Sequence, residues 1–174
     1  MDTLLSLDTQ ILDFIQAHVR TPWLDAFMPF FSSLGNIGFI WLLCAVILVC
    51  LPKHRKKGFF IILGLFLGFI LVNLVLKPLC ARPRPSWGTD ILLLIANPED
   101  FSFPSGHTAA AFIFAFLITN FSKKAGYIAI PAAALMAISR LYLYVHYPSD
   151  VLFSILLAFC ISCIVSRIAK KHMQ

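Results

Sequence analysis

The chain has 174 residues, of which 60% are hydrophobic and only 13% are charged, whereas soluble domains have about 45–50% and about 25%. A soluble globular protein of this size would leave much of that apolar surface in water, and disorder requires low hydrophobicity, so both classes are excluded. The formal net charge of +6 comes from short basic clusters between apolar runs, which indicates a membrane protein with cytoplasmic anchors rather than a nucleic-acid-binding protein.

The N-terminal segment, residues 1–30, is predicted to contain an amphipathic helix that lies in the membrane interface. Its apolar face carries Leu4, Leu7, Ile11, Phe14 and Ile15, and its polar face carries Asp2, Thr9, Asp13, Gln16 and Arg20. A Thr-Pro-Trp break at residues 21–23 ends this helix. No signal peptide is predicted, because the start is acidic and no long apolar core follows it.

Five apolar runs within residues 31–170 are each predicted to cross the bilayer as a helix, which needs about 20 mostly apolar residues. They are Phe31–Leu51, Gly58–Leu76, Thr108–Phe121, Gly126–Val145 and Val151–Ile168. The third run is short and reaches only about 21 Å as a helix, so it either begins below the lipid headgroups or tilts little. The predicted fold is all-α: one domain, residues 1–174, in which a polytopic membrane bundle of about five transmembrane helices follows the interfacial helix.

The cysteines do not indicate a metal site. There are five, an odd number, and they show neither zinc-finger spacing nor a disulfide framework. We therefore expect them to be small buried hydrophobic residues.

Basic clusters predict which ends of the helices face the cytoplasm. With five spans, the clusters that follow the first, third and fifth runs share one face, where no Asp or Glu accompanies them. They are Lys53, Arg55, Lys56 and Lys57, then Lys123 and Lys124, then Arg167, Lys170 and Lys171. By the positive-inside rule this face is cytoplasmic. The chain is thus predicted to be a multi-pass protein of the inner (plasma) membrane, with its N-terminal helix and the loops at residues 77–107 and 147–150 outside.

Four cations contradict this charge bias. Lys77, Arg82, Arg84 and Arg140 are predicted at the outer face, and Arg140 lies within the fourth apolar run. A charge embedded in the membrane costs at least a few kcal/mol on insertion scales. We therefore expect the outer face to bind an anion.

Three segments at the outer face supply the parts of a phosphate site: Lys77 with Arg82-Pro83-Arg84-Pro85, then Pro104-Ser105-Gly106-His107, then Ser139-Arg140 with His146 and Asp150. Pro104-Ser105-Gly106-His107 opens the third span, where the unpaired amides of a helix N-terminus bind phosphate and Gly106 lets the backbone approach closely. Lys77, Arg84 and Arg140 would hold the equatorial oxygens, on which charge accumulates in phosphoryl transfer.

A pair of histidines and one carboxylate supply the reactive groups. A neutral imidazole can attack phosphorus, and a protonated one can give its proton to the leaving oxygen; His107 and His146 provide the pair. The Tyr147-Pro148 break puts Asp150 in the first turn of the fifth span, where it could hold the ring N–H of His146. No cluster of Cys, His or carboxylates predicts a metal, so the cations would replace one.

These segments match, position for position, the signature K-x6-R-P, P-S-G-H and S-R-x5-H-x3-D, and the chain resembles small bacterial members of the type-2 phosphatidic acid phosphatase (lipid phosphate phosphatase) superfamily. The resemblance implies a metal-independent phosphatase without a cofactor. It assigns His146 as nucleophile, Asp150 as its orienting partner and His107 as general acid. Phosphate binding falls to Lys77, Arg84, Ser105, Gly106 and Arg140, with an auxiliary role for Arg82, which is outside the strict pattern. Vanadium haloperoxidases share this site architecture but are soluble, so the composition argues against that branch.

The expected partners are the bilayer and a lipid phosphate or diphosphate, not nucleic acid, and the sequence predicts no oligomeric state. By family analogy the first choice is undecaprenyl diphosphate, hydrolysed to undecaprenyl phosphate. The alternatives are phosphatidylglycerophosphate or phosphatidate, and the 1-phosphate of lipid A; a lipid phosphotransferase is a remoter one. Acidic residues of the outer loop, Asp90, Glu99 and Asp100, are expected to face solvent, or else to repel or orient a charged headgroup.

Overall fold

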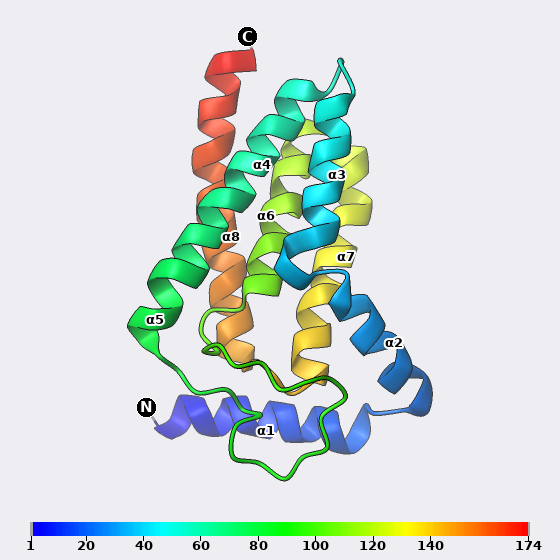
Figure 1. The fold of residues 1–174 in the computed structure, drawn as a ribbon, viewed down its shortest axis with the longest axis vertical. Coiled ribbons are helices and arrows are strands. Elements are labelled where there is room, and N and C mark those ends of the chain that lie inside the picture. The colour runs from blue at the N-terminus through cyan, green and yellow to red at the C-terminus, as the bar shows by residue number, and fades with distance from the viewer. Residues whose placement is uncertain (1, 174) are drawn as a thin grey trace.

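The structure, a computed structural model, describes residues 2–173 apart from the side chains of Asp2 and Met173, and in this range it contains helices and loops but no strand. The elements are α1 (Asp2–His18), α2 (Pro22–Ser33), η1 (Asn36–Gly38), α3 (Phe39–Cys50), α4 (Arg55–Phe69), η2 (Ile70–Leu76), α5 (Lys77–Cys80), α6 (Gly106–Phe121), α7 (Lys123–Tyr142) and α8 (Pro148–Met173). Helices α3, α4, α6, α7 and α8 form a bundle along the long axis, and α1 lies across one end (Figure 1).

The helices confirm the predicted all-α membrane bundle. Three helices in the described part of the chain are long and apolar enough to span a bilayer: the continuous helix formed by α4, η2 and α5, then α7 and α8. The pair α2 and α3 passes the same test together, although the two are bent by 48°. Helix α6 is a shorter apolar helix of 16 residues.

Hydroxyl side chains define where several helices begin. Thr21 caps α2, where its Oγ1 accepts a hydrogen bond from the backbone N–H of Leu24 at 3.3 Å, and Pro22 follows as the first helical residue. Ser122 caps α7 in the same way through the N–H of Ala125. The short polar breaks of the sequence are therefore helix starts with a physical cause.

The first predicted span, Phe31–Leu51, is not one straight helix. It is broken at residues 34–38, where Ile37 and Gly38 adopt left-handed backbone conformations with φ of 55° and 71°. A Cβ atom on Gly35 would lie 2.9 Å from Cδ2 of His107, so the break brings bare backbone against that ring. The division at residue 30 between the N-terminal segment and the core falls within α2.

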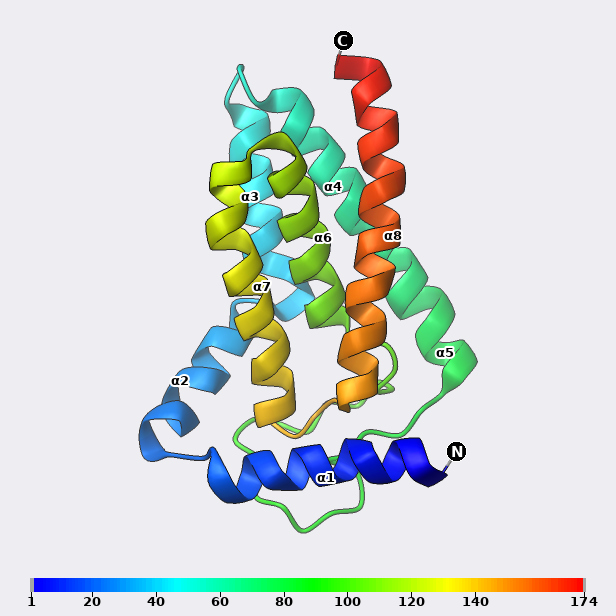
Figure 2. The ribbon, with the colours of Figure 1, turned by 180° about the vertical axis from the view of Figure 1, so that it is seen from behind.

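Helix α6 occupies the centre of the bundle and packs against α4, α7 and α8 (Figures 1 and 2). Two glycines of α4, Gly64 and Gly68, face it: a Cβ on Gly64 would lie 2.6 Å from Cδ1 of Leu117, and one on Gly68 would overlap Ile113. Small residues four apart let membrane helices approach closely. The element that opens with the Pro-Ser-Gly-His segment is thereby held rigidly.

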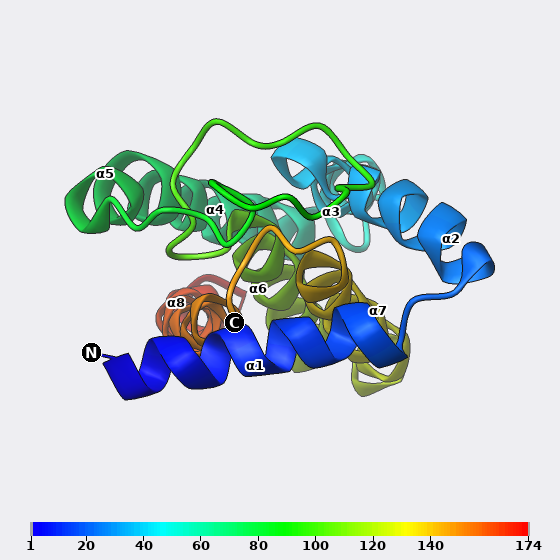
Figure 3. The same cartoon turned by 90° about the horizontal axis from the view of Figure 1, so that it is seen from below.

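The predicted amphipathic helix is α1, and it lies flat across the end of the bundle (Figure 3). Its apolar residues Leu4, Leu7 and Phe14 are more than half exposed, as suits contact with lipid at the interface. Its polar side chains instead contact the turn between α7 and α8: the hydroxyl of Tyr144 donates to Asp13 at 2.9 Å, and Gln16 donates to the carbonyl of Tyr142 at 2.9 Å. Hydrogen bonds from the polar face of α1 therefore hold this helix against the rest of the protein.

The two ends of the bundle differ in charge. The turn between α3 and α4, the turn between α6 and α7 and the C-terminal end of α8 gather at the end opposite α1 (Figures 1 and 2). These three places carry the basic clusters of the sequence. Helix α1 and the long loop at residues 81–105 cover the other end (Figure 3).

The expectation that the cysteines are buried is wrong. Cys50, Cys80 and Cys160 are exposed, Cys44 and Cys163 are partly exposed, and all five are free thiols. In a helix bundle that faces the hydrocarbon of a membrane, an apolar side chain is as stable on the lipid-facing surface as in the core. A cysteine within an apolar run therefore need not be buried inside the protein.

Candidate active site

A cavity of about 950 Å³ lies between α2–α3, α4 and α6 and reaches the loop at residues 81–105. Its polar part is lined by Lys77, Arg84, His107, Arg140 and His146. These side chains come from α5, the long loop, α6, α7 and the turn between α7 and α8. The fold therefore brings both predicted histidines and three predicted cations, which are far apart in the sequence, into one cavity.

A change of helical winding positions Lys77. The preceding segment η2 is a π-helix, and the backbone N–H of Lys77 donates to the carbonyl of Val72, five residues earlier. Such wide turns are rare and occur often at functional sites. Lys77 is 6% exposed and lines the cavity, as does Asn73 of the π-helical segment.

The guanidinium of Arg140 is buried in the bundle, and among the described residues no carboxylate pairs with it. Its side chain is 4% exposed and its Nη1 donates to the hydroxyl of Ser32. Its Nε has no hydrogen-bond partner, and Arg140 makes no ion pair, among the described residues. A buried guanidinium in this state is costly, so an anion that enters the cavity would meet an unsatisfied donor.

The other two cations of the cavity, Lys77 and Arg84, form ion pairs with Asp100 of the long loop. Asp100 forms an ion pair with Lys77, and its Oδ1 lies 2.6 Å from Nη2 of Arg84, whose Nε also donates to the backbone carbonyl of Asp100 at 2.7 Å. Burial opposes ionisation, but Lys77 and Arg84 together lower the pKa of Asp100 to about 2. The Asp100 side chain is half exposed. It is paired with two of the cations that the sequence predicts for phosphate binding.

His146 presents an accepting nitrogen to the cavity. Nη1 of Arg84 lies 3.1 Å from Nε2 of His146, and because a guanidinium only donates, Nε2 is the acceptor and the ring proton is on Nδ1. Burial, followed by the charges of Arg84 and Arg140, holds the pKa of His146 well below its usual value. A neutral imidazole becomes a nucleophile once its accepting nitrogen gives up such a hydrogen bond.

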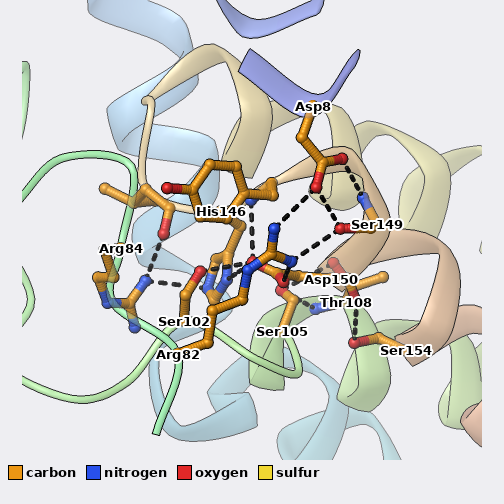
Figure 4. A network of polar contacts seen from close by, with 12 residues as sticks. Asp8, Arg82, Arg84, Ser102, Ser105, Thr108, His146, Ser149, Asp150 and Ser154 are labelled. Carbon is orange, nitrogen blue, oxygen red and sulfur yellow. Dashed lines mark hydrogen bonds and ion pairs between the residues drawn. The ribbon is translucent and has the colours of Figure 1, made fainter. Parts of the chain in front are cut away.

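Asp150 lies behind His146, in the first turn of α8, and is completely buried. Its Oδ2 lies 3.6 Å from Nδ1 of His146, within ion-pair range but longer than a hydrogen bond. The same oxygen accepts from the Ser102 hydroxyl at 2.5 Å and from the Tyr147 N–H at 2.9 Å (Figure 4). The carboxylate is therefore held in position to face the protonated nitrogen of the ring.

The Pro-Ser-Gly-His segment contributes through its backbone and its histidine. The Ser105 hydroxyl caps α6: it accepts from the Thr108 N–H at 3.4 Å and lies 2.9 Å from the Thr108 hydroxyl. Gly106 lines the cavity, whereas buried Ser105 does not. The first turn of α6 thus turns its backbone toward the cavity, and helix N-terminal amides favour anions there.

His107 has a partner that the sequence did not reveal. Its Nε2 lies 3.1 Å from Oδ1 of Asn36, in the break between α2 and α3. Asp8 and Asp100 were likewise absent from the predicted site residues. Arg82, which was predicted to assist, does not line the cavity; it lies behind it and contacts Asp8 and Asp150.

The chain is similar to known proteins both in sequence and in fold. A model described as PAP2 superfamily matches residues 57–174. The chain is 34% identical to phosphatidylglycerophosphatase B of Bacillus subtilis, over 77% of this chain and 70% of that protein. It is 31% identical to an undecaprenyl-diphosphatase of Sulfolobus acidocaldarius, over 80% of this chain and 68% of that protein. The crystal structure of Aquifex aeolicus LpxE covers 92% of this chain and 95% of its own, with a TM-score of 0.81 and 30% identity.

Asp100→Asn should strengthen inhibition by inorganic phosphate or orthovanadate severalfold, because the ionised carboxylate competes for Lys77 and Arg84. The inhibition constants would be measured in detergent with a lipid phosphate as substrate. Asp90→Asn is the matched control, since it removes the same charge from an exposed position of the same loop. Weaker inhibition of Asp100→Asn would show instead that Asp100 organises the cations.

Proposed function

The chain belongs to the PAP2 superfamily and is a membrane lipid phosphatase, and from its site we propose that it works through a phospho-histidine formed on Nε2 of His146. The observation that carries this proposal is the accepting Nε2 of a buried, neutral imidazole in a cavity lined by Lys77, Arg84 and Arg140. Nucleophile and phosphate-binding groups then share one cavity. No other described part of the chain offers this combination.

In the first step, Nε2 of His146 attacks phosphorus as the bond from phosphorus to the leaving oxygen breaks. His107 gives its proton to that oxygen, so the lipid product leaves as an alcohol or a phosphate. Arg84 exchanges its contact with Nε2 for one with a phosphate oxygen. The three cations and the first amides of α6 bind the equatorial oxygens, where charge accumulates. Asp150 stabilises the phosphoimidazole cation from the Nδ1 side.

In the second step, water attacks the phosphorus of the phospho-histidine. The His107 imidazole, now neutral, takes a proton from this water, and the bond from phosphorus to Nε2 breaks. Inorganic phosphate forms, and both histidines return to their starting states. The charge that a metal ion would otherwise neutralise is met by Lys77, Arg84 and Arg140, so we propose that the reaction is independent of metal ions.

The depth of the site favours a lipid substrate. The 16 residues of α6 span about 24 Å, less than the hydrocarbon core of about 30 Å. If the Lys123–Lys124 turn lies at the cytoplasmic headgroups, Gly106 and His107 lie slightly within the opposite leaflet. Below the polar groups, the cavity continues along apolar side chains that include Ile62, Leu65, Phe66 and Phe69 of α4. A lipid tail suits this lining, whereas a soluble ester would leave it empty.

The distribution of charge supports an extracytoplasmic site in the inner (plasma) membrane. The basic clusters lie at the end of the bundle opposite α1 (Figures 1 and 2). By the positive-inside rule, that end faces the cytoplasm. The polar lining of the cavity includes Lys77 of α5 and Arg84 of the long loop, which belong to the α1 end. The active site then faces the outside, where a lipid carrier is released in its diphosphate form.

Among lipid substrates we propose undecaprenyl diphosphate, which is hydrolysed to undecaprenyl phosphate and inorganic phosphate. The support is the similarity to proteins named undecaprenyl-diphosphatase, at 31% and 27% identity. Phosphatidylglycerophosphate is the second candidate, because the relative named phosphatidylglycerophosphatase B is 34% identical. A lipid A phosphate is the third, since the named relatives include a lipid A 4'-phosphatase. Transfer of the phosphate to another acceptor would require that acceptor to replace water in the second step.

His146→Ala is expected to reduce phosphate release by at least about a thousandfold, because the nucleophile is lost. His107→Ala should reduce it by about a hundredfold or more, because the proton donor is lost. Activity of the wild type should persist in EDTA, and acid quenching should trap labelled phosphate on His146. Complete loss of activity in EDTA, or label on another residue, would disprove this mechanism.

The pH profile of kcat/KM is expected to be bell-shaped. His146 must be neutral to attack, and since its pKa is depressed, activity should persist below pH 6.5, the ordinary region for histidine, and fall only as the pH drops through that lowered pKa. On the alkaline side activity should decline as the general acid loses its proton. A flat profile from pH 5 to pH 9, or an acidic limb above 6.5, would contradict these paired roles.

A substrate panel tests the lipid assignment. The purified protein would be assayed with undecaprenyl diphosphate, phosphatidylglycerophosphate, phosphatidate and lipid A, and we expect the highest kcat/KM with undecaprenyl diphosphate. Added lipid or sugar acceptors should receive no phosphate, because the product is inorganic phosphate. Preference for another lipid would reassign the substrate and leave the site chemistry intact.

A further inference from the structure

We propose that Asp8, on the interfacial helix α1, is a positioning residue for catalysis that acts through Arg82 on Asp150. The proposal rests on the proposed function, in which Asp150 stabilises the cation that forms on His146. Asp8 lies outside the region that the family model matches, residues 57–174. Helix α1 would then be a part of the active site as well as a contact with the membrane.

Asp8 is buried, with 2% of its surface exposed, although it lies on a helix whose apolar face is open. Its Oδ2 lies 2.8 Å from Nη2 of Arg82 and accepts from the Ser149 hydroxyl at 2.5 Å. Its Oδ1 accepts from the backbone N–H of Ser149 at 2.9 Å (Figure 4). Ser149 is in the first turn of α8, where backbone amides lack intrahelical partners. Asp8 thus caps the helix that carries Asp150.

Arg82 connects the two carboxylates. Its Nη1 lies 2.5 Å from Oδ1 of Asp150 and donates to the Ser149 hydroxyl at 2.8 Å, while Nη2 holds Asp8. The guanidinium carbon also lies 4.0 Å from the centre of the Tyr147 ring. A planar guanidinium that is held at both terminal nitrogens, Nη1 and Nη2, and at its face has one orientation. It therefore orients the Asp150 oxygen that does not face His146.

The charges explain why two carboxylates are needed. Arg82 alone would cancel the negative charge of Asp150, which the phosphoimidazole cation requires. With Asp8 on its other side, Arg82 is shared, and the cluster of Asp8, Arg82 and Asp150 retains one negative charge. The other charged or titratable groups around His146 are Lys77, Arg84, Asp100, His107 and Arg140. Most of them are cations, so a surplus negative charge behind the ring is the main compensation available to it.

The test compares Asp8→Asn with Asp13→Asn. Both remove a hydrogen-bonded carboxylate from α1. Asp8 contacts Ser149 at the start of α8, whereas Asp13 accepts from the Tyr144 hydroxyl in the turn before α8 and is not joined to Asp150. Asp8→Asn should lower kcat by about tenfold or more, with KM changed by less than about threefold. It should also move the acidic limb of kcat/KM to lower pH, because one negative charge near His146 is gone. Asp13→Asn should change none of these quantities by more than about twofold.

Loss of structure alone would lower the amount of active enzyme but would not move a pH limb. If Asp8→Asn and Asp13→Asn behave alike, or if Asp8→Asn alters only KM, the proposal is overturned. Should Asp8→Asn fail to fold, Arg82→Lys tests the same contact from the other side. It keeps the charge, but its single amino group cannot hold Asp8 and Asp150 in the same geometry, so kcat should fall to a similar extent; unchanged kcat would refute the proposal.

A double variant tests the connection directly. If Asp8 acts through Arg82, then Asp8→Asn combined with Arg82→Gln should be no slower than Arg82→Gln alone within about twofold. Effects that multiply would show that Asp8 acts independently of Arg82, against the proposal.

Orthovanadate separates this proposal from the function on which it rests. If the wild type hydrolyses none of the lipids in the panel, the proposed function fails, and binding of orthovanadate is measured by the shift in thermal unfolding. As an analogue of the pentacoordinate phosphoryl group, it places the same demand on His146 and Asp150. Asp8→Asn should then bind it at least about fivefold more weakly than Asp13→Asn does; equal affinities would overturn the positioning role.

Discussion

The structure depends on the burial of three cations at one end of a membrane helix bundle. Lys77, Arg84 and Arg140 are each less than 10% exposed, and Arg140 has no counterion among the described residues. Removing such charges from water is expensive. Asp100 offsets part of the cost at Lys77 and Arg84, and an anion in the cavity would offset more of it. The depressed pKa of His146 follows from the same burial and the same charges. In the proposed mechanism, phosphate binding and an unprotonated nucleophile therefore both result from one electrostatic arrangement.

The helices hold that arrangement in place without a metal ligand cluster in the part of the chain described. Helix α6 lies in the centre of the bundle, where it packs mainly against α4, α7 and α8. The π-helical segment η2 places Lys77, and the break after α2 brings Asn36 to His107. Each reactive group comes from a different element, and packing of apolar helices keeps these elements in register. Preorganised charge of this kind is the largest contribution that most enzymes make to their rate.

Much of this could be predicted from the sequence, for identifiable reasons. The lengths of the apolar runs predict the helix bundle, because the thickness of the bilayer sets the length of a spanning helix. The motif spacing from Lys77 to Asp150 predicts the candidate site, because binding and cleaving a phosphate would need those groups close together. Asp8, Asn36 and Asp100 could not be found in this way, since each acts through a contact with a residue at least 16 positions away in the chain. The break at residues 34–38 was hidden within an apolar run. There, two residues with positive φ decide the path, and hydropathy does not register backbone angles.

The ion pairs of Asp100 bear on how the enzyme completes a cycle. Its carboxylate is tethered to the loop at residues 81–105, so its effective concentration at Lys77 and Arg84 does not depend on what is dissolved outside. In the proposed reaction, inorganic phosphate would have to compete with the Asp100 carboxylate for the same two cations, which would favour its departure. Product release would then exchange one anion for another and would not expose unpaired cations.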